Sequence, residues 1–210
     1  LFPDLTPPTI TCPSPITVSC SSAVPIADIA SVTGVSDDCS GVVTVTHQGD
    51  VISGQTCANR YTITRTYRAT DVCGNFAQCT QIITVNDVIA PVITCPGNIT
   101  VNASPGLCSA VVTFTTTATD NCAGAVTIVS VPASGTAFRV GTTTVISSAT
   151  DVCGNSSNCT FTITVVDNQP PVIVCPANII ANNTPGLCSA VVNYPLPTVT
   201  DNCCLPGAVS

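Results

Sequence analysis

The chain carries one short motif three times, as PPTITCP at residues 7–13, APVITCP at 90–96 and PPVIVCP at 170–176. The copies begin 83 and then 80 residues apart. A fixed period is the sequence signature of tandem structural repeats. We therefore expect the chain to fold as a series of similar modules.

Two further motifs recur in the same order within each period. They are DDC at 37–39, DNC at 120–122 and 201–203, and ATDVCGN at 69–75 and 149–155. These anchors define four segments: 1–6 as the tail of a preceding repeat, 7–89 as repeat 1, 90–169 as repeat 2 and 170–210 as the first half of repeat 3. We expect the incomplete repeats to be completed within a longer array or by strands of neighbouring molecules.

The composition predicts an all-β protein. The helix formers Glu, Lys and Met are absent, whereas Val, Thr and Ile recur throughout. Short β-branched runs bounded by Gly, Pro, Asn or Asp are the expected strands, at 16–18, 42–46, 61–67, 80–85, 110–114, 126–131, 142–147 and 161–166. Six or seven such strands in about 80 residues are typical of a β-sandwich.

Composition also excludes several classes of protein. A mean hydropathy of +0.51 with a net charge of -7 does not fit a disordered chain. No run approaches the roughly 18 uninterrupted apolar residues of a membrane helix. Four Arg and no Lys provide no basic surface, so we expect neither nucleic-acid binding nor membrane insertion. Fifteen cysteines indicate an oxidising compartment, and the predicted location is secreted or cell surface.

Repeat 2 resembles the hyalin repeat, or HYR, family nearly throughout. The matching strings are VITCPGNITV at 92–101, PGLCSAVVTF at 105–114, TATDNC at 117–122, FRVGTTTVISSATDVCGN at 138–155 and NCTFTITVVD at 158–167. The resemblance covers essentially the whole chain, although residues 54–73 of repeat 1 depart from the pattern. It implies tandem immunoglobulin-like β-sandwiches in an extracellular protein, usually associated with adhesion.

Proline-containing linkers separate the repeats, at residues 4–8, 87–91 and 167–171. Proline fixes φ, and these linkers contain no Gly or Ser that would make a flexible hinge. We therefore expect the modules to stack as a stiff rod.

The positions of the cysteines predict a disulfide framework. In an immunoglobulin-like sandwich, the start of the first strand and two of the loops lie at one end. This arrangement predicts the pairs Cys12–Cys79, Cys39–Cys73, Cys95–Cys159 and Cys122–Cys153. Cys20 and Cys57 would then pair at the opposite end of repeat 1, because repeat 2 has Ala103 and Ala137 at those positions.

The remaining cysteines have less obvious partners. Cys108 has no counterpart in repeat 1 and competes with Cys153 for Cys122. Cys175 is expected to require a partner beyond residue 210. Cys188 is expected to pair with Cys203 or Cys204.

Five N-x-S/T sequons are candidate glycosylation sites, at Asn98, Asn102, Asn155, Asn158 and Asn182. A surface with 7% charged residues and no lysine has little protection against aggregation through strand edges. We therefore expect covalent glycans, or burial against identical subunits, to cover this surface.

Aspartates recur in the linkers and loops, where their expected role is to accept backbone hydrogen bonds in turns. No cofactor or metal site is predicted. If calcium binds between modules, the candidate ligands are Asp87, Asp120 and Asp167, because linker and loop carboxylates would together offer several oxygens. A single histidine and the lack of a C-x-x-C pair disfavour zinc.

The sequence offers no constellation for catalysis. It has no Glu, one histidine, no G-x-S-x-G elbow and no redox C-x-x-C, so we expect no enzyme activity. The leading hypothesis is a structural extracellular repeat protein that forms a stiff rod or filament, as in an adhesin stalk or surface fibre. The alternative is an adhesive module whose loops between DNC and DVC recognise glycans or a protein partner.

Overall fold

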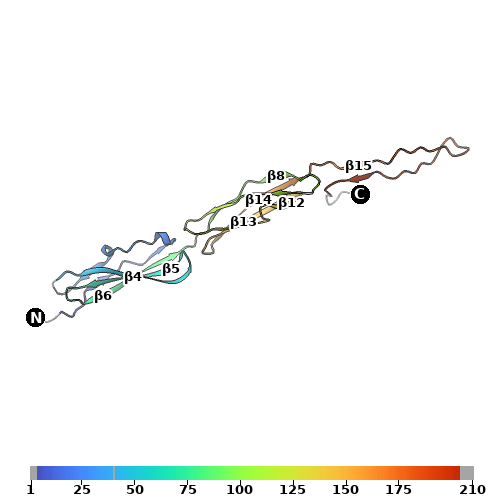
Figure 1. Ribbon diagram of the computed structural model, residues 1–210. Helices are drawn as coiled ribbons and strands as arrows, with labels where there is room; N and C mark the ends of the chain where they lie inside the picture. The colour runs from blue at the N-terminus through green and yellow to red at the C-terminus, as the bar shows by residue number, and fades with distance from the viewer. Residues whose placement is uncertain (1–3, 40, 204–210) are drawn as a thin grey trace. The chain divides into compact units, whose positions relative to one another are not determined.

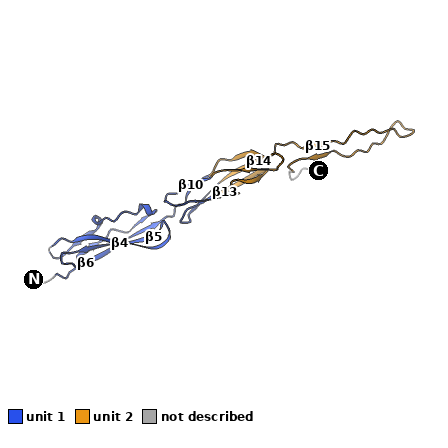
Figure 2. Cartoon of the chain, in the orientation of Figure 1, with its two compact units in different colours: residues 1–94, 116–129, 147–159 blue, residues 95–115, 130–146, 160–210 orange. Residues whose placement is uncertain are grey.

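The computed structural model describes residues 4–39 and 41–203, and the secondary structure in these ranges is almost entirely β (Figure 1). The chain divides into two compact units (Figure 2). Unit 1 comprises residues 1–94, 116–129 and 147–159, and unit 2 comprises 95–115, 130–146 and 160–210. Repeat 2 contributes residues to both units, so the units do not coincide with the sequence repeats.

Repeat 1 is built on a four-stranded sheet, whose order is β2 (Ile16–Val18), β6 (Phe76–Asn86), β5 (Arg60–Thr70) and β4 (Thr44–Cys57). The central pair is antiparallel, with Ile63 opposite Ile83. Strand β2 runs parallel to β6, with Ile16 opposite Ile83. Strand β4 lies at one edge of the sheet and continues through two register shifts.

Two smaller sheets belong to unit 1. Strand β1 (Thr9–Thr11) pairs with β3 (Thr33–Ser36), and β7 (Val92–Thr94) pairs with β10 (Thr117–Thr119). Two single-turn 3-10 helices, η1 (Ser21–Ala23) and η2 (Ile29–Ser31), lie between β2 and β3. The second begins at Asp28, whose carboxylate accepts the Ala30 N–H.

The core of repeat 1 contains one charged side chain among apolar ones. Alternate residues of β5 and β6 are buried, as expected for strands with one face against a core, and include Ile63, Tyr67 and Ile83. Arg65 shares this buried face and donates to both carboxylate oxygens of Asp50, at 2.9 and 2.8 Å. These hydrogen bonds lower the pKa of Asp50 and raise that of Arg65.

Repeat 2 repeats this plan, with a much shorter edge strand β11 of 5 residues in place of the 14-residue β4. Its four-stranded sheet has the order β11 (Thr127–Val131), β13 (Gly141–Thr150), β14 (Ser156–Val166) and β8 (Ile99–Asn102). Strand β9 (Ser109–Val112) pairs with β12 (Thr136–Arg139). In unit 2, Val112, Phe138, Val145, Phe161 and Ile163 belong to one buried apolar cluster.

Repeat 3 contributes two described strands, β15 (Val172–Val174) and β16 (Thr198–Thr200), which pair with each other. Most large apolar residues of this segment are exposed, including Ile180, Val191 and Leu196. In repeat 2, the corresponding residues are followed by strands β13 and β14. Residues 170–210 of repeat 3 contain no sequence equivalent of these two strands.

The predicted all-β class with tandem immunoglobulin-like modules is confirmed. Each expected strand overlaps an observed one, although the run expected at 42–46 is the start of the 14-residue strand β4. The predicted strand was too short because polar residues such as Gln48 and Asp50 interrupt the apolar pattern. Strand β4 tolerates them at a sheet edge, where most of its side chains are exposed.

Candidate functional site

The residues that join repeat 1 to repeat 2 form a dense contact within unit 1, which we call the first junction. Repeat 1 contributes Cys20, the turn from Cys57 to Arg60 between β4 and β5, and Asp87. Repeat 2 contributes the loops 120–123 and 151–155. These are the DNC and DVCGN motifs, so the first junction is made largely by the repeated sequence anchors.

Two disulfides cross the first junction. Cys20 is bonded to Cys122, and Cys57 is bonded to Cys153, each with 5.2 Å between the Cα atoms. Their sequence separations are 102 and 96 residues. Each disulfide therefore links one repeat to the next rather than closing a loop within a repeat.

Asn59 lies at the centre of the first junction, where 1% of its surface is exposed. Its side-chain oxygen accepts the Ser21 N–H at 2.9 Å, and its side-chain nitrogen donates to the Ala123 carbonyl at 3.3 Å. Its own carbonyl accepts the Asp87 N–H at 3.0 Å. The side chain and the main-chain carbonyl of this one buried residue thus satisfy backbone groups of repeat 1, the linker and repeat 2.

Arg60 connects the linker to the DVCGN turn. Its guanidinium donates to the Asp87 carbonyl at 2.6 Å and to the Cys153 carbonyl at 3.2 Å. The side-chain nitrogen of Asn155 also donates to the Asp87 carbonyl, at 3.3 Å. The linker backbone is therefore held by two side chains from two different repeats.

Asp151 fixes the turn that presents Cys153 and Asn155. Its Oδ1 accepts the backbone N–H groups of Cys153 and Asn155, and its Oδ2 accepts the Asn155 side chain at 2.7 Å. Desolvation opposes ionisation of this carboxyl, but these hydrogen bonds outweigh it and hold its pKa below the ordinary value. The ionised carboxylate is thus part of the turn.

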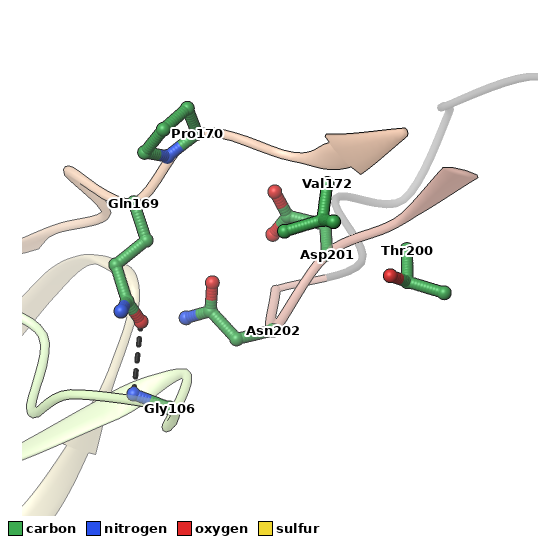
Figure 3. A pocket seen from close by; sticks show the side chains of 7 residues that line it. All are labelled: Gly106, Gln169, Pro170, Val172, Thr200, Asp201 and Asn202. Carbon is green, nitrogen blue, oxygen red and sulfur yellow. Dashed lines mark hydrogen bonds between the residues drawn. The ribbon is translucent and has the colours of Figure 1, made fainter. Parts of the chain in front are cut away.

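Unit 2 contains a second junction, between the loop 104–108 of repeat 2 and residues of repeat 3. Cys108 is bonded to Cys203, the side chain of Asn202 donates to the Leu107 carbonyl at 3.2 Å, and the Gly106 N–H donates to the Gln169 side chain at 2.9 Å. An open pocket of about 350 Å³ lies beside these contacts, lined in part by Gly106, Gln169 and Asn202 (Figure 3).

The disulfide framework differs from the expected one. The predicted Cys12–Cys79 pair is present. The predicted pairs Cys20–Cys57 and Cys122–Cys153 are wrong, because each of these cysteines is bonded across the first junction. Cys39 and Cys73 are free and exposed, so their predicted pair is also wrong.

The expectations for the remaining cysteines have mixed outcomes. Cys188 is free and Cys203 is bonded to Cys108, which excludes the predicted Cys188–Cys203 pair. Cys204 lies outside the described residues. Cys175 is free within the described chain. Cys95 and Cys159 are both in disulfides, and their predicted pairing stays a prediction.

The aspartates named as calcium candidates lie at the junctions. Oxygens of Asp87 and Asp120 lie within 4.8 Å of one another and of the Cys122 sulfur. Asp167 and Asp201 form the same arrangement with Cys203, and Asp4, Asp37 and Asp38 form a similar one with Cys39. The sequence motif thus brings one linker aspartate and one loop aspartate together three times.

The candidate glycosylation residues differ in accessibility. Asn98, Asn102, Asn158 and Asn182 are exposed. Asn155 is half-buried, and its side-chain nitrogen, to which a glycan would be attached, donates to Asp151 and to the Asp87 carbonyl. Four of the five sequons are therefore open to modification.

Sequence reasoning did not identify Asn59 and Arg60 as junction residues. They lie in the part of repeat 1 that departs from the family pattern. A usable signal was their position beside Cys57, in the turn between two strands.

Comparisons with known proteins agree with the repeat pattern. The HYR domain model matches residues 86–165. Hyalin from Strongylocentrotus purpuratus is 31% identical over 209 residues, which cover 94% of this chain and 17% of that protein. Hyalin from Lytechinus variegatus is 34% identical over 211 residues, which cover 94% of this chain and 38% of that protein. This chain therefore spans well under half the length of either hyalin.

Two solved structures align with most of this chain at low similarity. Human CDH23 EC21-23 aligns with 82% of this chain and 74% of its own at 15% identity and a TM-score of 0.34. Protocadherin gammaB7 EC3-6 aligns with 81% of this chain and 50% of its own at 19% identity and a TM-score of 0.33.

A search of the described residues for membrane-spanning helices identifies none that is long and apolar enough. The matched range 86–165 contains the DNC motif at 120–122 and the DVCGN motif at 151–155 that contribute to the first junction. Residues 86–165 thus match the HYR domain, and the chain is similar to hyalins over most of its length.

Proposed function

We propose that this chain is part of an extracellular structural protein, in which consecutive repeats are fixed end to end to form a stiff rod or filament related to cell adhesion. The observation that carries the proposal is that three disulfides, Cys20–Cys122, Cys57–Cys153 and Cys108–Cys203, each link a repeat to the following one. Disulfides persist in oxidising, extracellular compartments. A covalent link at both described junctions limits the hinge motion that short linkers usually permit between domains.

The first junction supports stiffness in a second way. The linker residues Asp87 and Pro91 are fully buried, and Asn59 and Arg60 hold the Asp87 backbone by hydrogen bonds. A linker with satisfied, buried backbone groups cannot move independently without exposing or breaking them. We infer that these contacts restrict motion of repeat 2 relative to repeat 1 at the first junction.

Glycans are the proposed covering of this surface. The side chains of Asn98, Asn102, Asn158 and Asn182 are exposed and could carry them. Glycopeptide mapping of protein from a secretory host tests this. We expect occupancy at several of these residues and none at Asn155, and uniformly unmodified sequons would contradict the proposal.

The rod is tested by small-angle X-ray scattering and negative-stain imaging of the chain before and after reduction. We expect a single, narrow distribution of end-to-end distances in the oxidised protein. Reduction, or the variant Cys20→Ser/Cys57→Ser/Cys122→Ser/Cys153→Ser, should broaden it. A broad distribution in the oxidised protein would overturn the proposal.

A binding role is the second candidate, supported by the edge strand β4. This strand is 14 residues long, pairs on one side only, and exposes Val51 and Ile52 at 65% and 55% of their surfaces. Edge strands of this kind can accept a strand from a partner. Val51→Lys/Ile52→Lys should abolish saturable binding to cells or matrix if adhesion uses this edge, and should leave the shape unchanged.

A further inference from the structure

Cys39 and Cys188 are free and exposed, although each belongs to a motif that forms a disulfide elsewhere in the chain. Cys39 ends the DDC motif of repeat 1, and the corresponding DNC cysteines, Cys122 and Cys203, are both bonded to another repeat. Cys188 corresponds to Cys108, which is bonded to Cys203. These two thiols are therefore the two kinds of cysteine that meet at the second junction.

The loop that carries Cys188 has the same sequence and the same turn as the loop that carries Cys108. The string PGLCSAVV occurs at residues 105–112 and again at 185–192. In both copies the leucine N–H donates to the carbonyl three residues earlier at 2.9 Å. The glycine of the turn has a positive φ, of 73° in repeat 2 and 82° in repeat 3. Proline followed by such a glycine is typical of a type II turn, so repeat 3 presents Cys188 on a preformed loop.

The loop that carries Cys39 matches the DNC loop that carries Cys203. The Cys39 N–H donates to Asp37 Oδ1 at 2.9 Å, and the Cys203 N–H donates to Asp201 Oδ1 at 2.7 Å. The same aspartate turn therefore orients the cysteine in both loops.

A hollow beside the Cys39 loop corresponds to the pocket at the second junction. That pocket has a volume of about 350 Å³, and one of its seven lining residues, Gly106, belongs to the loop of the other repeat (Figure 3). The hollow has a volume of about 390 Å³, and its lining residues occupy the same positions in the repeat as the other six. They are Thr6, Pro7, Thr9, Ser36, Asp37 and Asp38. The hollow thus matches the second junction without the loop that Gly106 belongs to.

We propose that Cys188 of one copy of the chain forms a disulfide with Cys39 of a second copy, whose hollow receives the loop 184–189. The contact is the one that Cys108 and Cys203 make between repeats 2 and 3, where the Cα atoms are 5.0 Å apart. The occupant is a second copy because this chain carries both halves of the contact, exposed and unbonded. Copies add head to tail, since each linked copy still offers its other half.

The bond requires an oxidant, and a low-molecular-weight disulfide of the glutathione type supplies it. Exchange with one protein thiol gives a mixed disulfide and releases one small thiol. The second protein thiol attacks the protein sulfur of the mixed disulfide and releases the other small thiol. In total the two protein thiols lose two electrons and two protons, and the small disulfide gains them as two thiols.

One hydrogen bond of the second junction has no equivalent in this contact. The side chain of Asn202 donates to the Leu107 carbonyl, whereas its counterpart Asp38 has a carboxylate that cannot donate. The Thr6 hydroxyl donates to the Asp38 carboxylate at 2.8 Å, and an asparagine oxygen accepts this bond equally well. Asp38→Asn should therefore supply the missing donor for the Leu187 carbonyl.

The experiment uses the whole chain, equilibrated in a buffer of reduced and oxidised glutathione at increasing protein concentration. Non-reducing electrophoresis reports the linked species, and peptide mass spectrometry identifies the bonded cysteines. Cys39→Ser and Cys188→Ser each remove one half of the contact. Cys73→Ser and Cys175→Ser are the matched controls, because these two cysteines are also free and exposed.

We expect a ladder of multimers from wild type, Cys73→Ser and Cys175→Ser, and monomers from Cys39→Ser or Cys188→Ser alone. A mixture of these last two variants should form one dimer and nothing larger, since each keeps the half that the other lacks. Asp38→Asn should raise the ratio of linked to unlinked chains roughly fivefold, the effect of one added hydrogen bond.

Wild-type chains that stay monomeric with both thiols free would overturn the proposal. So would a Cys39–Cys188 bond within one chain, which an extent of linkage independent of protein concentration would reveal. Bonds through Cys73 or Cys175, multimers of either single variant, or an unchanged ratio in Asp38→Asn would also contradict it. The inference does not rest on a stiff rod, because flexible chains with these two loops would link in the same way. Scattering from the Cys39→Ser monomer tests stiffness separately.

Discussion

The two junctions hold consecutive repeats together by different means. The first has two disulfides, a buried amide at Asn59 and a guanidinium at Arg60. The second has one described disulfide and hydrogen bonds from Asn202 and Gly106 on a more open surface. The cysteine of the DNC motif is bonded in both, to Cys20 in one case and to Cys108 in the other.

This difference shows which part of a junction is fixed and which part varies. The DNC loop presents its cysteine through the same aspartate turn at Cys122 and at Cys203. The upstream partner follows strand β2 in repeat 1 and lies in the loop before β9 in repeat 2. A repeat can therefore change the position of its own cysteine and still reach the next repeat.

Removal of the disulfides should have the largest effect, and it should be greater at the first junction. We expect Cys20→Ala/Cys57→Ala/Cys122→Ala/Cys153→Ala to lose about 2–4 kcal/mol per bridge in the free energy of unfolding. Cys108→Ala/Cys203→Ala removes a single bridge and should lose about half as much in total. Urea unfolding followed by circular dichroism measures both, and equal losses would contradict the ranking of the junctions.

Asn59→Ala should be the most damaging single substitution at the first junction. It leaves the Ser21 N–H and the Ala123 carbonyl without their partner, and each unsatisfied group costs about 1–3 kcal/mol. Asn202→Ala is the matched change at the second junction, where the hydrogen bond is exposed and a loss below about 1 kcal/mol is expected. Hydrogen exchange at Ser21 should also accelerate in Asn59→Ala only.

Acid should weaken the first junction through Asp151. The pKa of this carboxyl is lower in the folded protein than in the unfolded chain, so its stabilisation is complete above the unfolded value of about 3.9. The stabilisation is lost as pH falls through the folded value. Unfolding midpoints between pH 7 and pH 2.5 should fall less steeply in Asp151→Asn than in wild type, and parallel profiles would exclude this role.

The smallest effect concerns Cys39, the free counterpart of Cys122. A hydrogen bond to the Asp4 carboxylate raises the pKa of the Cys39 thiol to about 11, so little reactive thiolate exists at pH 8. We expect Asp4→Asn to accelerate alkylation of Cys39 by iodoacetamide roughly tenfold. Peptide mass spectrometry provides the rate, and Cys73 is the internal control.

The sequence was sufficient to predict the fold class, half of the described strands and the Cys12–Cys79 disulfide. The other disulfides could not be predicted because the argument assumed that each repeat closes on itself. Cys20 and Cys57 lie at the end of repeat 1 that meets the next repeat, so their partners are about one period further along the chain. Spacing within a repeat contains no information about such a contact. The burial of Arg65 was also unexpected, because its partner Asp50 comes from a neighbouring strand.

The offset of the disulfides by one repeat has a consequence for biosynthesis. Cys20 and Cys57 have no partner until 102 and 96 further residues have been made. At about 5–20 residues per second, these thiols wait for some 5–20 s as the chain emerges. The disulfides between repeats can therefore form only after part of the following repeat has been synthesised, and those of repeat 1 become possible before the one between repeats 2 and 3.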